Sequence, residues 1–89
     1  MRDSDSILKE ASKVVRGARR HHYGTPSVNH GRTAALWSVY LGREITPEQV
    51  CMLNILQKVS RGMNRLTRDT LVDIAGYAEN VHLIQTAKE

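Results

Sequence analysis

The stretch Thr46–Val81, TPEQVCMLNILQKVSRGMNRLTRDTLVDIAGYAENV, decides the fold that the sequence predicts. Apolar residues recur at helical spacing in two runs, which a short link, RGMNRLT, separates. The runs predict helices over about 46–62 and 67–86. Because the link is short, the two helices are expected to pack as an antiparallel hairpin.

The ends of these helices have recognisable capping residues. Thr46 is followed by Pro47, which suits a first helical position, and by Gln49, which completes a capping box. Thr67 is the expected cap of the second helix, and Gly62 is the expected end of the first. The residues expected to face inward are Val50, Leu53, Leu56 and Val59, then Leu71, Ile74 or Ala75, Ala78 and Val81.

Two further helices are expected before the hairpin. One runs from about Ser4 to Arg19, with acidic residues near its start that suit the helix dipole, Asp3 and Asp5. The other follows the cap Thr25, with a proline at its first position, and continues to Leu41. No segment alternates long enough to predict a strand. The prediction is one all-α domain of four helices over residues 1–89.

The composition favours a small soluble domain. The 89 residues are 40% hydrophobic and 25% charged, without an apolar run of the about 18 residues that a membrane span needs. The acidic start does not resemble a signal peptide, so a cytoplasmic location is expected. The single cysteine, Cys51, excludes an internal disulfide and is expected to be a small buried residue. A chain of this length buries a thin core, so we expect self-association.

The net charge of +4 is unevenly distributed. Residues 1–45 contain eight Lys or Arg and four acids, whereas residues 46–89 contain five of each. The first half should therefore attract anions. A solvated basic helix face explains the charge equally well.

The densest group of polar and aromatic residues lies in Arg19–Trp37, RRHHYGTPSVNHGRTAALW. A zinc site is not expected, because His21 and His22 diverge by about 100° on a helix and His30 lies beyond a turn. No serine or cysteine is placed as a nucleophile partner of a histidine.

Anion binding fits this stretch better. Backbone amides in the first turn of the 25–41 helix could surround a phosphate together with basic side chains. Tyr23 and Trp37 could offer ring faces to a base, although Trp37 also suits the core and the whole stretch also suits a capped helix corner. The candidate ligand residues here are Arg19, Arg20, His22, Tyr23, Gly24, Asn29, Arg32 and Trp37.

Polar residues also recur along the hairpin. Lys58 and Arg61 lie on one helix, while Asp73 and Asp69 lie on the next, so the two pairs could neutralise each other across the hairpin. Such a network could simply fix the register of the helices.

The same acidic residues invite a magnesium hypothesis. Mg²⁺ acting on a triphosphate needs several carboxylates. The 46–62 helix supplies only Glu48, at its start, and Lys58 would repel the ion. We therefore expect no metal and no catalytic residue. If the protein is an enzyme, its catalytic residues are Asp69, Asp73 and Glu48, with Mg²⁺.

The segment Tyr23–Val81 resembles a family of small uncharacterised bacteriophage proteins. The shared pattern is Tyr-Gly-x-Pro, an Asn, an Arg, Trp-Ser-x-Tyr-Leu-Gly, Thr-Pro-Glu, Lys-x-x-Arg and Asp-x-x-x-Asp-Ile-x-Gly-Tyr. Those proteins are similar in turn to MazG-type all-α nucleoside triphosphate pyrophosphatases, which bind Mg²⁺ through Glu-x-x-Glu and Glu-x-x-Asp motifs. This chain has no Glu-x-x-Glu before the hairpin.

The resemblance implies a nucleotide-sized pocket. The departure from the enzyme motif, with Lys58 in the acidic zone, puts hydrolysis in doubt, so we expect a ligand that is held without being cleaved. Phage proteins of this description are sponges, which sequester cyclic nucleotide or cyclic ADP-ribose signals of immune systems such as CBASS and Thoeris. In a homo-oligomer acting in the cytoplasm of an infected bacterial host, Lys58 and Arg61 would add charge where subunits join. The alternatives are a Mg²⁺-dependent MazG-like pyrophosphatase and a nucleic-acid-binding module.

Overall fold

The computed structural model describes residues 6–89, and over that range it contains helices and no strands, so the all-α prediction is confirmed. The helices are α1 (Ile7–Arg16), α2 (Ala18–Tyr23), α3 (Pro26–Leu41), α4 (Pro47–Asn64) and α5 (Arg68–Thr86).

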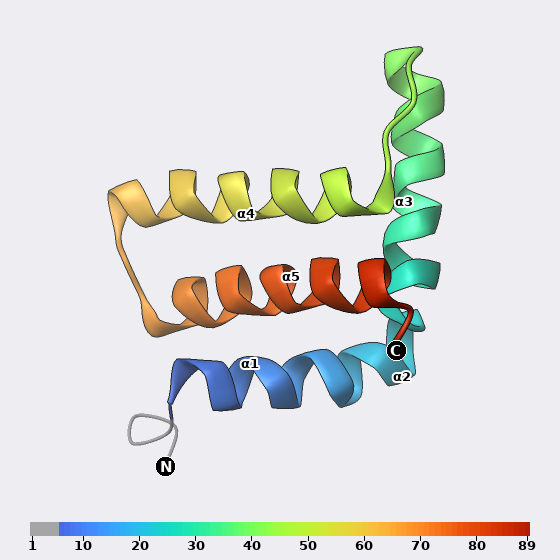
Figure 1. Ribbon diagram of the computed structural model, residues 1–89. Helices are drawn as coiled ribbons and strands as arrows, with labels where there is room; N and C mark the ends of the chain where they lie inside the picture. Colours follow the sequence, from blue (N-terminus) through green and yellow to red (C-terminus); the bar gives the residue numbers. More distant parts are fainter. Residues whose placement is uncertain (1–5) are drawn as a thin grey trace.

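Three of the helices form a layer (Figure 1). In it, α5 lies between α4 and α1, and the most extensive packing is that of α4 on α5. The helices α4 and α5 run in opposite directions, as the hairpin prediction required. The helix α3 crosses one end of the layer, and the short α2 leads from α1 to it. Across residues 6–89, every helix is too short or too polar to cross a lipid bilayer.

The predicted caps are confirmed for three helices. Thr25 Oγ1 accepts the backbone N–H of Val28 at the start of α3. At the start of α4, the Thr46 hydroxyl accepts the Gln49 N–H at 3.1 Å, while the Gln49 side chain accepts the Thr46 N–H at 2.9 Å. The Thr67 hydroxyl likewise accepts from the first turn of α5. These local signals set the starts of α3, α4 and α5.

The prediction of one helix from Ser4 to Arg19 was wrong, because the chain breaks at Gly17 and continues as α2. A Cβ atom at Gly17 would lie 2.6 Å from the main-chain oxygen of Lys13, too close for any other residue. The break is therefore specific to glycine. The expected start, with Asp3 and Asp5, lies outside the described residues.

The prediction that the first hairpin helix ends at Gly62 was wrong, because α4 continues to Asn64. A Cβ atom at Gly62 would lie 3.2 Å from Leu66 Cδ1 and 3.6 Å from Thr70 Cγ2. The glycine thus lets the link between α4 and α5 pack closely against α4.

The core is thin and made of small side chains. Among residues 6–89, the buried hydrophobic residues are Ala11, Val15, Ala34, Val50, Cys51, Val72 and Leu83. Within α5, Thr70 and Gly76 are buried as well. Small residues allow close approach of helices but remove little apolar surface from water.

Most of the residues that were predicted to face the inside of the hairpin are not buried. Val50 is buried, but Leu53, Leu56 and Val59 are exposed, as are Leu71 and Ala78. The side of α4 that faces α5 instead contains polar residues. Asn54 Nδ2 donates to the Val50 carbonyl, and Lys58 forms an ion pair with α5. The apolar stripe of α4 consequently faces away from α5.

Candidate functional site

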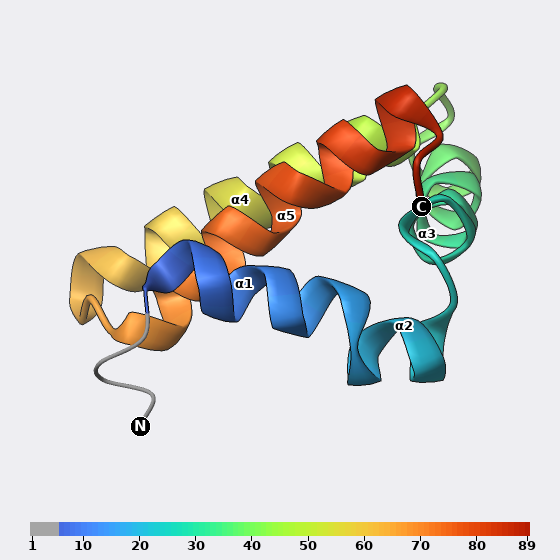
Figure 2. The same cartoon turned by 60° about the horizontal axis from the view of Figure 1, so that its bottom comes forward.

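Figure 2 shows α1 and α5 diverging toward α3. A small cleft, partly open to solvent, lies among these helices. Side chains from α1, α2, α3 and α5 line it, so segments far apart in sequence meet here. Its polar lining includes Arg19, Arg20, Asn29, His30, Tyr77 and Asn80.

His30 forms the buried part of this lining. The Asn80 side-chain amide donates to Nε2 of His30 at 3.2 Å, since an amide nitrogen cannot accept a hydrogen bond. The Tyr77 ring packs edge-on against the imidazole, with 5.9 Å between ring centres. Burial, assisted by the positive charge of Arg19, lowers the pKa of His30. His30 is therefore a neutral imidazole near pH 7.

Two arginines of α2 bring positive charge to the cleft. The guanidinium carbon of Arg19 lies 5.9 Å from the ring centre of Tyr23, which suits a cation–π contact. Arg20 donates through Nη1 to the main-chain oxygen of Glu89. Its Nε atom is buried without a partner among the described residues, so one donor remains available to a ligand.

A carboxylate occupies the start of α3. The backbone N–H of Ser27, in the first turn, donates to Oε1 of Glu89 at 2.6 Å. Together with the Arg20 contact, this places the acidic residue between a helix N-terminus and a guanidinium. Both groups favour negative charge, and carboxylate and phosphate oxygens accept the same hydrogen bonds.

Asp73 lines the cleft, but its carboxylate forms an ion pair with Lys58 of α4. Its Oδ2 atom is 2.9 Å from Lys58 Nζ, and both side chains are largely buried, which confirms the predicted cross-hairpin pair. Among residues 6–89 there is no group of three or more His, Cys, Asp or Glu side chains that could hold a metal together. The third proposed carboxylate, Glu48, lies near Cys51 instead. Burial, followed by the Glu48 charge, raises the pKa of Cys51 to about 12.

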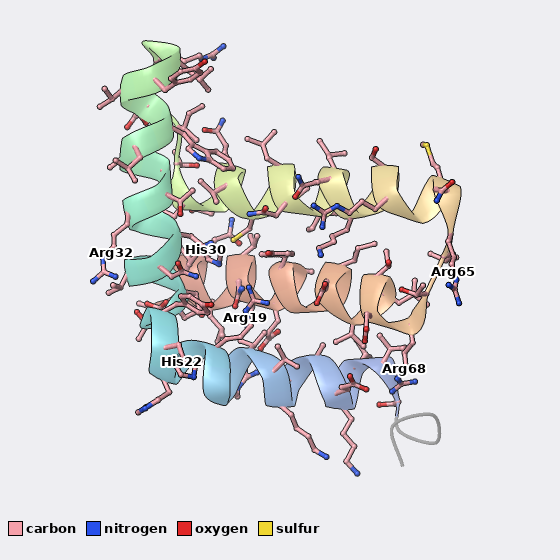
Figure 3. The ribbon with its side chains drawn as sticks, turned by 180° about the vertical axis from the view of Figure 1, so that it is seen from behind. Arg19, His22, His30, Arg32, Arg65 and Arg68 are labelled. Atoms are coloured by element: carbon pink, nitrogen blue, oxygen red, sulfur yellow. The ribbon has the colours of Figure 1, made fainter. Side chains whose placement is uncertain are left out.

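The cleft brings together Arg19, Arg20, Gly24 and Asn29 of the ten predicted ligand residues. Figure 3 shows Arg32 pointing away from the layer on the outer side of α3. The remaining predicted residues lie elsewhere: His22 and Tyr23 are exposed on α2, Trp37 is half-buried further along α3, and Lys58 and Arg61 are on α4.

Among the polar residues that line the cleft, His30, Tyr77 and Asn80 were not predicted as site residues. Tyr77 and Asn80 share one face of α5 with Asp73 and Gly76, a polar stripe that is visible in the sequence. That stripe could have identified them. The position of His30 depends on how α3 crosses α5, for which the sequence has no local signal.

Comparisons with known proteins place the chain among phage proteins. The model of a family described as "Domain of unknown function (DUF6378)" matches residues 6–85. The Gene 55 protein of Mycobacterium phage L5 is 43% identical over 86 residues, which cover 94% of this chain and 55% of that protein. The Gene 55 protein of Mycobacterium phage D29 is 42% identical over 82 residues, covering 91% and 54%.

This chain therefore spans about half the length of these curated relatives. No solved structure matches it. The family match extends over all five helices described above, apart from the last residue of α5. The chain belongs to the DUF6378 family, a phage protein family.

Proposed function

We propose that the cleft binds a small phosphorylated nucleotide and that the protein acts as a phage sponge, which sequesters a cyclic nucleotide or cyclic ADP-ribose type signal without cleaving it. The observation that supports this most directly is the Glu89 carboxylate at the start of α3. The Ser27 N–H donates to this carboxylate, and Arg20 donates to the main-chain oxygen of the same residue. A ligand phosphate would displace Glu89 and accept the same hydrogen bonds.

The rest of the cleft suits the uncharged part of a nucleotide. The buried Oδ1 atom of Asn80 has no hydrogen-bond partner among the described residues, so it can accept from a base N–H. The Tyr77 ring, beside it on α5, offers apolar surface. Arg20, which comes from α2 and lines the same cleft, supplies a donor through its buried Nε. These groups can orient a base while the phosphate lies near α3.

The pairing of Asp73 supports capture without cleavage. Lys58 holds one oxygen of this carboxylate at 2.9 Å. A cation such as Mg²⁺ would have to compete with that ammonium for the same carboxylate. Hydrogen bonds and arginine charge therefore remain as the means of holding phosphates.

Two finer features belong to this proposal. The hairpin of α4 and α5, with α3 across its end, would be a MazG-like arrangement, and the protein would act as a homo-oligomer. A sponge needs a dissociation constant near or below the micromolar range, about −8 to −12 kcal/mol.

Calorimetric titration with cyclic dinucleotides, cyclic ADP-ribose isomers and ATP tests the proposal. Arg20→Gln should weaken binding of the ligand at least tenfold, whereas Arg32→Gln, on the outer side of α3, is the matched control and should bind as the wild type does. Glu89→Gln removes the competing charge and should tighten binding.

Mass spectrometry of the ligand released by heat should recover it intact, with and without Mg²⁺. Pyrophosphate or hydrolysed product would contradict capture. Equal effects of the Arg20 and Arg32 substitutions would contradict the assignment of the cleft.

A further inference from the structure

The solvent-facing side of α4 is apolar and almost without charge. Within Pro47–Asn64, the structure leaves five large hydrophobic residues exposed, namely Met52, Leu53, Leu56, Val59 and Met63. Met63 is 84% exposed and Leu56 is 61% exposed. Of the exposed residues in this helix, only Arg61 is charged. An isolated solvent-exposed helix face would ordinarily be rich in charged residues.

The spacing of this face is that of a helix-packing seam. Met52, Leu56, Val59 and Met63 follow one another at intervals of four, three and four residues. This is the pattern by which one helix packs along another. Lys58, which contacts α5, lies about 200° around the helix from Leu56, so the seam faces away from α5. Figure 1 shows α4 at the outer edge of the layer, with no helix of residues 6–89 beyond it.

The face has the properties of a contact between identical chains. The protein has a net charge of +4, yet the seam is uncharged, so two copies can meet there without like-charge repulsion. A nucleic acid would need lysines or arginines in the seam itself. The core of the single chain is thin, so a contact that buries more apolar surface would stabilise the folded protein.

The charges at the two ends of α4 favour one orientation. Glu48 lies at its start, while Arg61 and Arg65 lie at or just after its end. In an antiparallel pair, the acid of one copy approaches the arginines of the other. A parallel pair would bring all four arginines together.

We propose that α4 packs antiparallel against α4 of a second copy of this chain, with Leu56 opposite Val59 of the partner subunit and Met52 opposite Met63 of the partner subunit. The pairing is two-fold symmetric, because each contact occurs twice. It extends the layer edge to edge and leaves the cleft between α1 and α5 on the far side of each copy.

Sedimentation velocity tests the contact without any ligand, so its failure is distinguishable from failure of nucleotide binding. The wild type is expected at about 20 kDa or a multiple, against 10.0 kDa for one chain. Leu56→Lys should halve that mass. Leu36→Lys, at a 70% exposed position on α3, is the matched control and should keep it. A monomeric wild type at 100 µM, or an unchanged mass for Leu56→Lys, would overturn the proposal.

Disulfide trapping tests the orientation. When Leu56→Cys and Val59→Cys chains are mixed and oxidised, the antiparallel pairing predicts mainly the mixed dimer. Dominant self-pairing of each variant would indicate a parallel seam and overturn it. The native Cys51 does not interfere, because it is fully buried and its pKa is raised.

Discussion

Replacing Asp73 by Asn tests the ion pair that joins the two hairpin helices. The substitution keeps the shape of the side chain and removes its charge, so packing is nearly unchanged. Lys58, with 20% of its side chain exposed, then loses the carboxylate 2.9 Å from its ammonium. An ammonium that is largely withdrawn from water and has no partner destabilises the folded state.

The size of the effect follows from the exposure of the pair. Exposed ion pairs contribute about 0 to 1 kcal/mol, whereas breaking a fully buried pair costs about 3 to 5 kcal/mol. With 20% and 28% of the two side chains exposed, this pair lies between those limits. We expect Asp73→Asn to lower the free energy of unfolding by about 2 kcal/mol. In a domain of this size, that lowers the Tm by roughly 10 °C.

Urea unfolding followed by circular dichroism measures this change, at one fixed protein concentration so that self-association contributes equally. Lys58→Met and the double variant complete a double-mutant cycle. The double variant should be more stable than the sum of the two losses predicts, by about 1 to 2 kcal/mol. A coupling energy near zero would refute the reasoning, and would mean that the two groups do not depend on each other in solution.

Three other substitutions or reactions test separate parts of the fold. The pKa of His30 is lowered in the folded state, so the unfolded state binds the proton more readily. The stability that a neutral His30 provides should be complete above pH about 6.5 and decline as the pH falls. In urea titrations, the difference between wild type and His30→Gln should therefore shrink from pH 7.5 to pH 5, and a constant difference would contradict the lowered pKa. Cys51, fully buried with a pKa of about 12, should react with a disulfide reagent at pH 8 at least a hundredfold more slowly than in urea, and similar rates would contradict its burial. Gly17→Ala should lower the Tm by several degrees, because its Cβ would lie 2.6 Å from a main-chain oxygen, while Gly31→Ala, with nothing within 4 Å, should be neutral or stabilising.

Local signals predicted the helices well because they act over a few residues. Thr25, Thr46 and Thr67 each accept a backbone N–H three residues on, as their sequence context requires. The errors occur at glycines. Gly17 breaks a helix and Gly62 does not, and the difference lies in what surrounds each, the Lys13 oxygen in one case and Leu66 in the other. Each of these neighbours is only four residues away, but its position depends on whether the helix continues past the glycine, which the sequence alone did not specify.

The candidate site was predicted in part for a related reason. Charge and the helix N-terminus indicated Arg19 and Arg20, which line the cleft. The same reasoning indicated Arg32, which points away, because a count of arginines does not specify the face of a helix. The contact between His30 and Asn80 joins residues 50 positions apart and depends on how α3 crosses α5.

The apolar stripe of α4 shows what such a pattern can and cannot predict. The regular spacing of Leu56 and Val59 predicts that these side chains are buried. It does not specify whether residues of the same chain or of another chain bury them. Within the chain, α5 packs instead against the side that includes Lys58, where an ion pair fixes the register of the hairpin. One helix therefore uses its polar side for internal register and keeps its apolar side free. A second copy that covers this free side resolves the conflict between the stripe and its exposure, since the predicted burial then occurs between chains.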